Sequence, residues 1–236
     1  MTIHRLRSLL CALLIAGAGA VGVAPQYAAA TSGSLPACRY ADMPARNTSY
    51  SEWNETLLDT SYKLPKSYVP PGLVSTAQAG LKGGGEVRSI AISDLKAMAE
   101  AARSAGAGLR VVSAYRSYSY QVRLYNQEVA RYGKYTADHS VARPGHSEHQ
   151  LGVTIDFGSA ANGGDVSQKF AKTAAGKWMR ANGWKYGWVL SYPRGFTSKT
   201  CYFTEPWHYR YVGRAEAQRI HDSGLTLRQY LWKTYM

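Results

Sequence analysis

The residues best suited to chemistry in this sequence lie in two short segments about fifty residues apart. The first contains His149 and Asp156, and the second contains Glu205 and His208. Two neutral imidazoles and one carboxylate can hold Zn²⁺ while a fourth position stays open for water. A glutamate that does not bind the metal can then take a proton from that water. The residue types therefore indicate a hydrolytic zinc centre.

The spacing of the first pair requires a break in the backbone. Apolar residues alternate with polar ones from 153 to 157, which predicts a half-buried strand with Asp156 pointing away from its apolar face. On one straight strand His149 and Asp156 would point to opposite faces. Gly152 can adopt backbone angles that other residues avoid, so we expect His149 on a turn before the strand. Pro206 likewise argues against a plain central strand through the second segment.

Each of these residues also has an ordinary interpretation. Taken singly, His149 reads as a surface histidine, Asp156 as a turn residue and His208 as a packed aromatic neighbour. The helical His-Glu-x-x-His signature of many zinc proteases is absent. His139 and His146 are interpreted as non-ligands. The joint occurrence of the two segments nevertheless favours a metal site.

The two segments resemble those of the zinc D-alanyl-D-alanine carboxypeptidases of the vancomycin-resistance type. The shared motifs are Ser-x-His-x-x-Gly-x-x-x-Asp at 147–156 and Glu-x-Trp-His within 205–213, together with residues 113–121 and 187–193. The resemblance covers roughly residues 86–214. The wider group includes zinc LD-carboxypeptidases and dipeptidases, and it shares its fold with the signalling domain of hedgehog proteins.

This resemblance implies a role for seven residues. It implies that His149, Asp156 and His208 bind one zinc ion, that Glu205 is the catalytic base, and that Arg116, Gln121 and Ser147 contact substrate. The planar guanidinium of Arg116 suits either a substrate carboxylate or a developing oxyanion, so Arg116 counts as catalytic as well. The chain departs from the family pattern at Thr154, commonly alanine, and at Ser191, where many relatives carry a basic residue.

The N-terminal residues 1–30 are typical of a secretory signal peptide. A positive start at Arg5 and Arg7 precedes a mostly apolar run over residues 9–23, and an Ala-x-Ala site follows at residues 28–30. The apolar run is too short to be a membrane span. We therefore expect a secreted, extracellular protein associated with the cell wall.

Removing that segment leaves two cysteines, Cys38 and Cys201. Two thiols in an oxidising compartment usually pair. Such a disulfide would stabilise the folded state by about 5 kcal/mol, because it removes chain entropy from the unfolded state. The alternative is two free thiols.

The net charge predicts anionic partners. It is +13 for the chain and +11 once Arg5 and Arg7 are removed with the signal peptide, which contains no acid. Anionic cell-wall polymers would attract such a protein. Lysines and arginines are scattered and form no basic helix, which argues against nucleic acid. We expect a monomer.

The remaining pattern predicts an α+β fold in which helices flank an antiparallel sheet that carries the zinc site. Residues 31–85 are rich in turns and are interpreted as an extended arm anchored by Trp53, Leu57 and Leu58, and residues 86–236 as the zinc peptidase domain. The expected helices span residues 93–102, 118–132, about 167–182 and 215–223, and the other expected strands span 109–113, 200–203 and 209–212.

Together these observations predict a secreted zinc carboxypeptidase that removes the C-terminal D-alanine from peptidoglycan stem peptides. The cleaved bond could be D-Ala-D-Ala or an L,D bond. Two alternatives stay open: a peptidoglycan endopeptidase, and a non-catalytic wall-binding module that keeps the zinc ligands.

Overall fold

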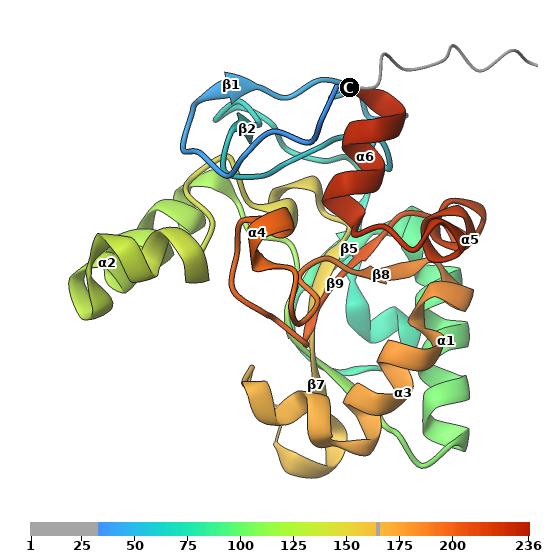
Figure 1. The fold of residues 1–236 in the computed structure, drawn as a ribbon. Helices are drawn as coiled ribbons and strands as arrows, with labels where there is room; N and C mark the ends of the chain where they lie inside the picture. Colours follow the sequence, from blue (N-terminus) through green and yellow to red (C-terminus); the bar gives the residue numbers. More distant parts are fainter. Residues whose placement is uncertain (1–32, 164–165) are drawn as a thin grey trace, which may run out of the picture.

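The computed structural model describes residues 33–163 and 166–236, so the expected signal peptide at residues 1–30 lies outside the described residues. The fold is built on a five-stranded sheet with the strand order β4-β6-β7-β9-β8 (Figure 1). Its strands are β4 (Lys82–Gly83), β6 (Leu109–Ser113), β7 (Thr154–Ser159), β8 (Trp188–Leu190) and β9 (His208–Tyr211). All neighbours are antiparallel except β4 and β6. The predicted α+β class with a largely antiparallel sheet is confirmed.

Helices lie on both sides of this sheet. They are α1 (Ile92–Ser104), α2 (Tyr118–Ser140), α3 (Ala174–Asn182), α4 (Thr197–Thr200), α5 (Arg214–Ser223) and α6 (Leu227–Tyr235). Figure 1 shows α1 and α3 on one side of the sheet and α2 on the other. Two small sheets complete the fold, a parallel pair of β1 (Met43–Pro44) and β2 (Tyr62–Lys63), and an antiparallel pair of β3 (Leu73–Ser75) and β5 (Glu86–Arg88).

Strand alternation decides which side chains enter the main core. Ile155 and Phe157 of β7 and Tyr209 of β9 point to the face covered by α1 and α3, where all three are almost fully buried. Asp156 and His208 therefore point to the opposite face. That face is also covered, so the prediction of a half-buried strand is wrong: every residue of β7 is buried.

The N-terminal segment from residue 33 to residue 85 helps to cover that face. Arg210, which points to the same face as His208, donates to the Trp53 carbonyl over 2.8 Å, and Leu57 and Leu58 are buried as expected of anchors. The segment ends in β4, which joins the sheet beside β6. Only glycine fits at Gly83 in this strand, because a Cβ there would lie 1.8 Å from the carbonyl oxygen of Val111.

Four further local predictions differ from the structure. The helix expected over about 167–182 is divided into a 3-10 helix, η5 (Gln168–Lys172), and α3, with Thr173 extended between them. Residues 200–203 are not a strand: α4 occupies 197–200, and Cys201 follows with a left-handed φ of 71°. The helix that begins at Tyr118 resumes after Gly133, whose angles (φ 79°, ψ 161°) bend it, and it ends at Ser140. Helix α6 was not predicted; Thr226 and Gln229 form a capping box at its start, and its apolar face packs on Leu57.

The disulfide between Cys38 and Cys201 is present, as predicted, with the two Cα atoms 5.3 Å apart. It ties the start of the N-terminal segment to the turn that follows α4. Within the described residues, no helix combines the length and the apolar character needed to cross a membrane.

Removing this disulfide should lower the stability of the fold more than it lowers the affinity for the metal. The Cys38→Ser/Cys201→Ser double variant should lose roughly 2–5 kcal/mol of unfolding free energy, because the unfolded chain regains the freedom of a long loop. Neither cysteine borders the candidate metal site described below, so zinc affinity should change little. Thermal unfolding and metal titration of both proteins measure the two effects, and an unchanged melting temperature would contradict the prediction.

Candidate metal centre

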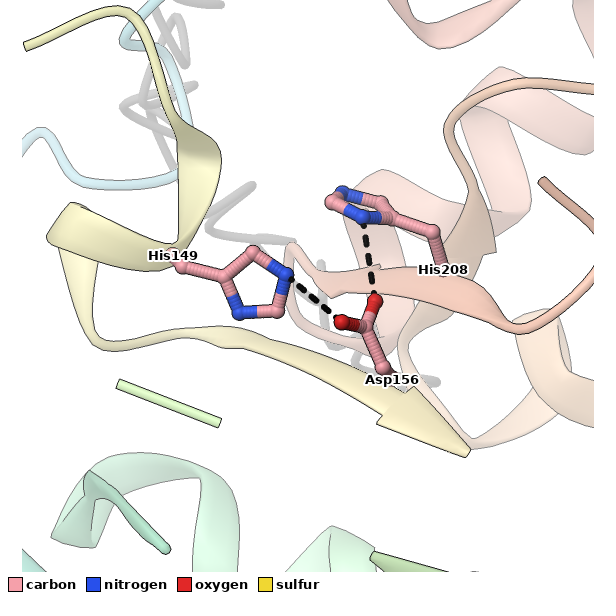
Figure 2. A group of neighbouring side chains, drawn as sticks. All are labelled: His149, Asp156 and His208. Atoms are coloured by element: carbon pink, nitrogen blue, oxygen red, sulfur yellow. Dashed lines mark ion pairs between the residues drawn. The ribbon is translucent and has the colours of Figure 1, made fainter. Parts of the chain in front are cut away.

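His149, Asp156 and His208 meet on the covered face of the sheet (Figure 2). Nε2 of His149 lies 3.2 Å from Oδ2 of Asp156, and Nδ1 of His208 lies 3.2 Å from Oδ1 of the same carboxylate. One ligand atom from each residue lies within 4.8 Å of the other two, and all three residues are buried. The structure therefore brings the three predicted ligands together.

Backbone geometry produces this meeting. Asp156 and His208 are directly opposite each other in the β7–β9 pairing, so their side chains emerge side by side. His149 lies in a 3-10 turn, η3 (Glu148–Leu151), as the spacing predicted. Gly152 ends this turn with φ 71°, and a Cβ there would come within 2.8 Å of Pro70. The turn thus places His149 beside the start of β7.

The state of the ligand atoms fits a divalent cation such as zinc. Nδ1 of His149 is 2.6 Å from the carbonyl oxygen of Ala114, so Nδ1 carries the proton and the lone pair of Nε2 is free to bind a metal. Burial lowers the pKa of His149 to about 4, so the ring is neutral at neutral pH. Nε2 of His149 and Oδ1 of Asp156 are buried and have no hydrogen-bond partner among the described residues. Buried polar atoms are rarely left in this way unless a ligand satisfies them.

His208 is oriented by a second carboxylate, that of Glu148. Nε2 of His208 lies 2.9 Å from Oε2 of Glu148, which turns Nδ1 toward the other ligands. The Ser191 hydroxyl and the Arg210 guanidinium donate to the same carboxylate over 2.7 and 3.1 Å. Burial alone would raise the pKa of Glu148, but the hydrogen bond from His208 and the charge of Arg210 outweigh it and lower the pKa to about 2. Glu148 is therefore ionised.

Glu148 is not among the site residues predicted from the sequence. Its only local signal is its position next to His149, whereas its partners His208 and Arg210 lie 60 and 62 residues away. Ser191, which departs from the family pattern, lies beneath the site and donates to Glu148. Thr154, the other departure, donates its hydroxyl to the backbone carbonyl of Glu148 over 3.1 Å. Both departures thus hold the turn that carries Glu148.

Glu205 lies beside the ligands but outside their group. Its Oε2 is 3.4 Å from Nδ1 of His208, and 13% of its side chain is exposed. A turn through Pro206, closed by a hydrogen bond from the His208 amide to the Glu205 carbonyl, positions the carboxylate. Burial raises the pKa of Glu205, which suits a group that must accept a proton and release it again.

A cavity of about 360 Å³ opens over these residues. Arg116 and Ser147 border it, along with Tyr192, Tyr202 and Trp207. The Arg116 guanidinium donates to Asp156 and to the Ser113 hydroxyl, which fixes its orientation. Two of the three predicted substrate contacts therefore face the cavity.

Gln121, the third predicted substrate contact, is buried and lies behind the cavity wall. Its side-chain amide donates to the carbonyl of Ala142, a residue of that wall, over 2.6 Å. The geometry gives Gln121 a part in shaping the cavity, and its contact with substrate stays a prediction.

Comparison with known proteins agrees with this geometry. Residues 85–214 match the VanY family, described as D-alanyl-D-alanine carboxypeptidase. The chain is 40% identical over 183 residues to YodJ of Bacillus subtilis (strain 168) and 32% identical over 193 residues to a D-alanyl-D-alanine carboxypeptidase of Enterococcus faecalis. These alignments cover 75% and 76% of this chain and 66% of each relative, just under two thirds of their length.

Solved structures show the same fold. The LdcB LD-carboxypeptidase superposes with a TM-score of 0.69 at 36% identity, covering 78% of this chain and 88% of that one. An E175A mutant of the D,D-pentapeptidase VanY from a VanB-type resistance cassette, solved with Zn(II), superposes with a TM-score of 0.65 at 30% identity over 76% of this chain and 99% of that one. A protein of similar fold was thus solved in complex with Zn(II).

Each of the three ligands should be required for metal binding. Purified protein should contain about one zinc ion, and His149→Ala, Asp156→Ala or His208→Ala should each lose it, because each removes one of only three protein ligands. Elemental analysis after dialysis measures the content. His139→Ala is the matched control and should keep the metal; full occupancy in His208→Ala would refute the assignment.

Removing the carboxylate of Glu148 should weaken both the metal site and the fold. Glu148→Ala should bind zinc roughly 10–100-fold more weakly, since His208 loses its orienting partner. It should also lose about 3–5 kcal/mol of stability, because Arg210 is left buried without its counter-ion. Glu148→Gln keeps the shape of the side chain and should be affected less. Glu100→Ala, at an exposed position of α1, is the control and should stay within about 0.5 kcal/mol; equal effects of the two alanine variants would contradict the prediction.

Proposed function

This chain belongs to the VanY family of D-alanyl-D-alanine carboxypeptidases, and from that premise we propose that it is a zinc carboxypeptidase that removes the C-terminal D-alanine from peptidoglycan stem peptides. The observation that carries the proposal is the arrangement in one cavity of the three ligands with a separate carboxylate, that of Glu205. A wall-binding module would need the ligands alone. A carboxylate of raised pKa beside them favours an enzyme.

His149, Asp156 and His208 would hold the zinc ion, which when bound supplies a Lewis acid that polarises the scissile carbonyl. Glu205 accepts the proton of the attacking water and passes it to the leaving amine. Its place at the cavity edge lets it reach both, since it is partly exposed while the ligands are not. Glu148 holds the His208 ring in one orientation throughout.

Arg116 and Ser147 provide the polar end of the substrate site. Both border the cavity, and the Arg116 guanidinium is already fixed by Asp156 and Ser113. A fixed guanidinium loses little entropy when it binds an anion. We assign it to the free C-terminal carboxylate of the stem peptide, the group that distinguishes a carboxypeptidase substrate from a cross-linked one.

Action outside the cytoplasm, at the cell wall, is part of the same proposal. The signal-like residues 1–30 support it, as does the Cys38–Cys201 disulfide, a bond typical of oxidising compartments. A net charge of +11 after removal of the signal peptide suits a protein that works among anionic wall polymers.

Cleavage of defined stem peptides tests the proposed function. Mass spectrometry should show loss of a single D-alanine from a penta- or tetrapeptide stem, and which of the two reacts decides between the D,D and L,D bond. The C-terminal amide of the same peptide should react roughly 10²-fold more slowly or worse, because the Arg116 guanidinium would lack its anionic partner. Equal rates for acid and amide would instead indicate an endopeptidase.

Two glutamate variants serve as controls in that experiment. Glu205→Gln should keep its zinc and lose activity by roughly 10²–10⁴. Glu128→Gln changes another carboxylate of the same cavity wall, one that accepts a hydrogen bond from Ser140, and should stay close to the unmodified enzyme. Loss of zinc in Glu205→Gln would make Glu205 a ligand and refute the proposed mechanism.

A further inference from the structure

Four aromatic side chains cluster on the surface beside the cavity: Tyr40, Tyr135, His139 and Phe203, here called the aromatic shelf. His139 lies at its centre, with ring centroids 4.6 Å from Tyr135, 5.3 Å from Phe203 in a stacked arrangement and 5.9 Å from Tyr40. Tyr135 is 74% exposed, and Tyr40 and Phe203 are each 40% exposed. Rings so exposed add little to folding, and a contiguous exposed aromatic group on a protein often marks an interaction surface.

The shelf and the cavity wall share two chain segments. His139 directly precedes residues 140–142, which line the cavity, and Phe203 directly follows Tyr202, which also lines it. The Phe203 amide donates to the His139 carbonyl over 2.8 Å, so the two segments are joined at the shelf itself. Phe203 is two residues from Glu205, which places their Cα atoms at most about 8 Å apart. The shelf is therefore continuous with the rim of the proposed active site.

The bend in α2 at Gly133 sets the direction of the helical residues that carry Tyr135 and His139. At Gly133 the helix turns with φ 79°, and a Cβ at that position would meet no atom within 4 Å. After the bend, Asp138 accepts hydrogen bonds from Tyr125, on the first half of the helix, and from Lys134. These bonds hold the second half of α2 in place, so that Tyr135 and His139 stand next to Phe203.

Polar and charged groups surround the rings. The Tyr40 hydroxyl lies 3.3 Å from Nε2 of His139. The Lys134 ammonium and the Arg143 guanidinium lie 5.6 and 5.4 Å from the centroid of the Tyr40 ring. The shelf thus combines flat apolar ring faces with hydrogen-bonding groups at their edges.

We propose that the aromatic shelf binds the amino-sugar rings of the glycan strand whose stem peptide enters the cavity, a proposal that rests on the proposed function. One face of a pyranose ring presents C–H groups that pack against the electron-rich face of an aromatic ring. The hydroxyl and acetamido groups at the sugar's edge need donors and acceptors, which Tyr40, His139 and Lys134 supply. A stem of five extended residues spans at most about 17 Å, so its sugar must lie near the rim.

Two substrates that differ only in the sugar test this inference. Rates are measured on the free stem peptide, penta- or tetrapeptide, that the unmodified protein cleaves and on the same peptide attached to its disaccharide, with Tyr135→Ala and Phe203→Ala as variants. We expect kcat/KM for the sugar-bearing substrate to fall about tenfold, the loss typical of truncating one aromatic anchor, and kcat/KM for the free peptide to stay within about twofold. Tyr50→Ala, which removes a 50% exposed tyrosine outside the shelf, should leave both unchanged. Tyr135→Phe should restore the rate.

A peptide-free ligand separates this inference from the proposed function. Binding of an N-acetylglucosamine tetrasaccharide, followed by NMR, should perturb the shelf residues in the unmodified protein and weaken in Tyr135→Ala. The inference is overturned by equal losses on both substrates, by no loss on either, by a tetrasaccharide that binds all variants alike, or by a dimer that Tyr135→Ala dissociates. If the unmodified protein cleaves neither the pentapeptide nor the tetrapeptide, with or without the sugar, the proposed function fails, and the tetrasaccharide still decides the shelf.

Discussion

The site and its surroundings depend on the hydrogen bonds that surround one buried, ionised carboxylate, that of Glu148. Burying a lone carboxylate costs several kcal/mol, so it persists only where donors surround it. Here His208 and Arg210 provide them from strand β9, and Ser191 from the loop that follows β8. Removing any one donor leaves a charge or a polar group without a partner. The carboxylate therefore couples the orientation of a metal ligand to the integrity of the fold.

Arg210 extends that coupling to the N-terminal segment. Its guanidinium is fully buried and donates both to Glu148 and to the carbonyl of Trp53. The Trp53 ring in turn stacks on Tyr211, the next residue of β9. The segment before the sheet thus helps to dry the face that carries the metal site. A dry site strengthens the electrostatic interactions inside it, and both faces of β7 are buried here.

The proposed active site lies where three parts of the chain meet. The sheet supplies Asp156 and His208, the turn η3 supplies His149, and the segment around Glu205 lines the cavity together with residues of α2. The exposed rings of the aromatic shelf lie at the rim of this site. Ionised groups are buried at the centre of the site and aromatic rings lie at its edge. This division suits a substrate with an anionic peptide carboxylate at one end and a bulky neutral sugar at the other end.

What the sequence determined by itself was the chemistry: the ligand types, the separate glutamate, the cysteine pair and the strand that carries Asp156. These follow from residue types and short spacings, which act over a few neighbouring residues. Only the tertiary structure decided the role of Glu148, because its partners lie 60 residues away and meet it through the β7–β9 register. The same reason applies to residues 200–203. They were predicted as a strand, but the disulfide at Cys201 and the hydrogen bond from the Phe203 amide to the His139 carbonyl hold them in a turn, since long-range contacts override weak local preferences.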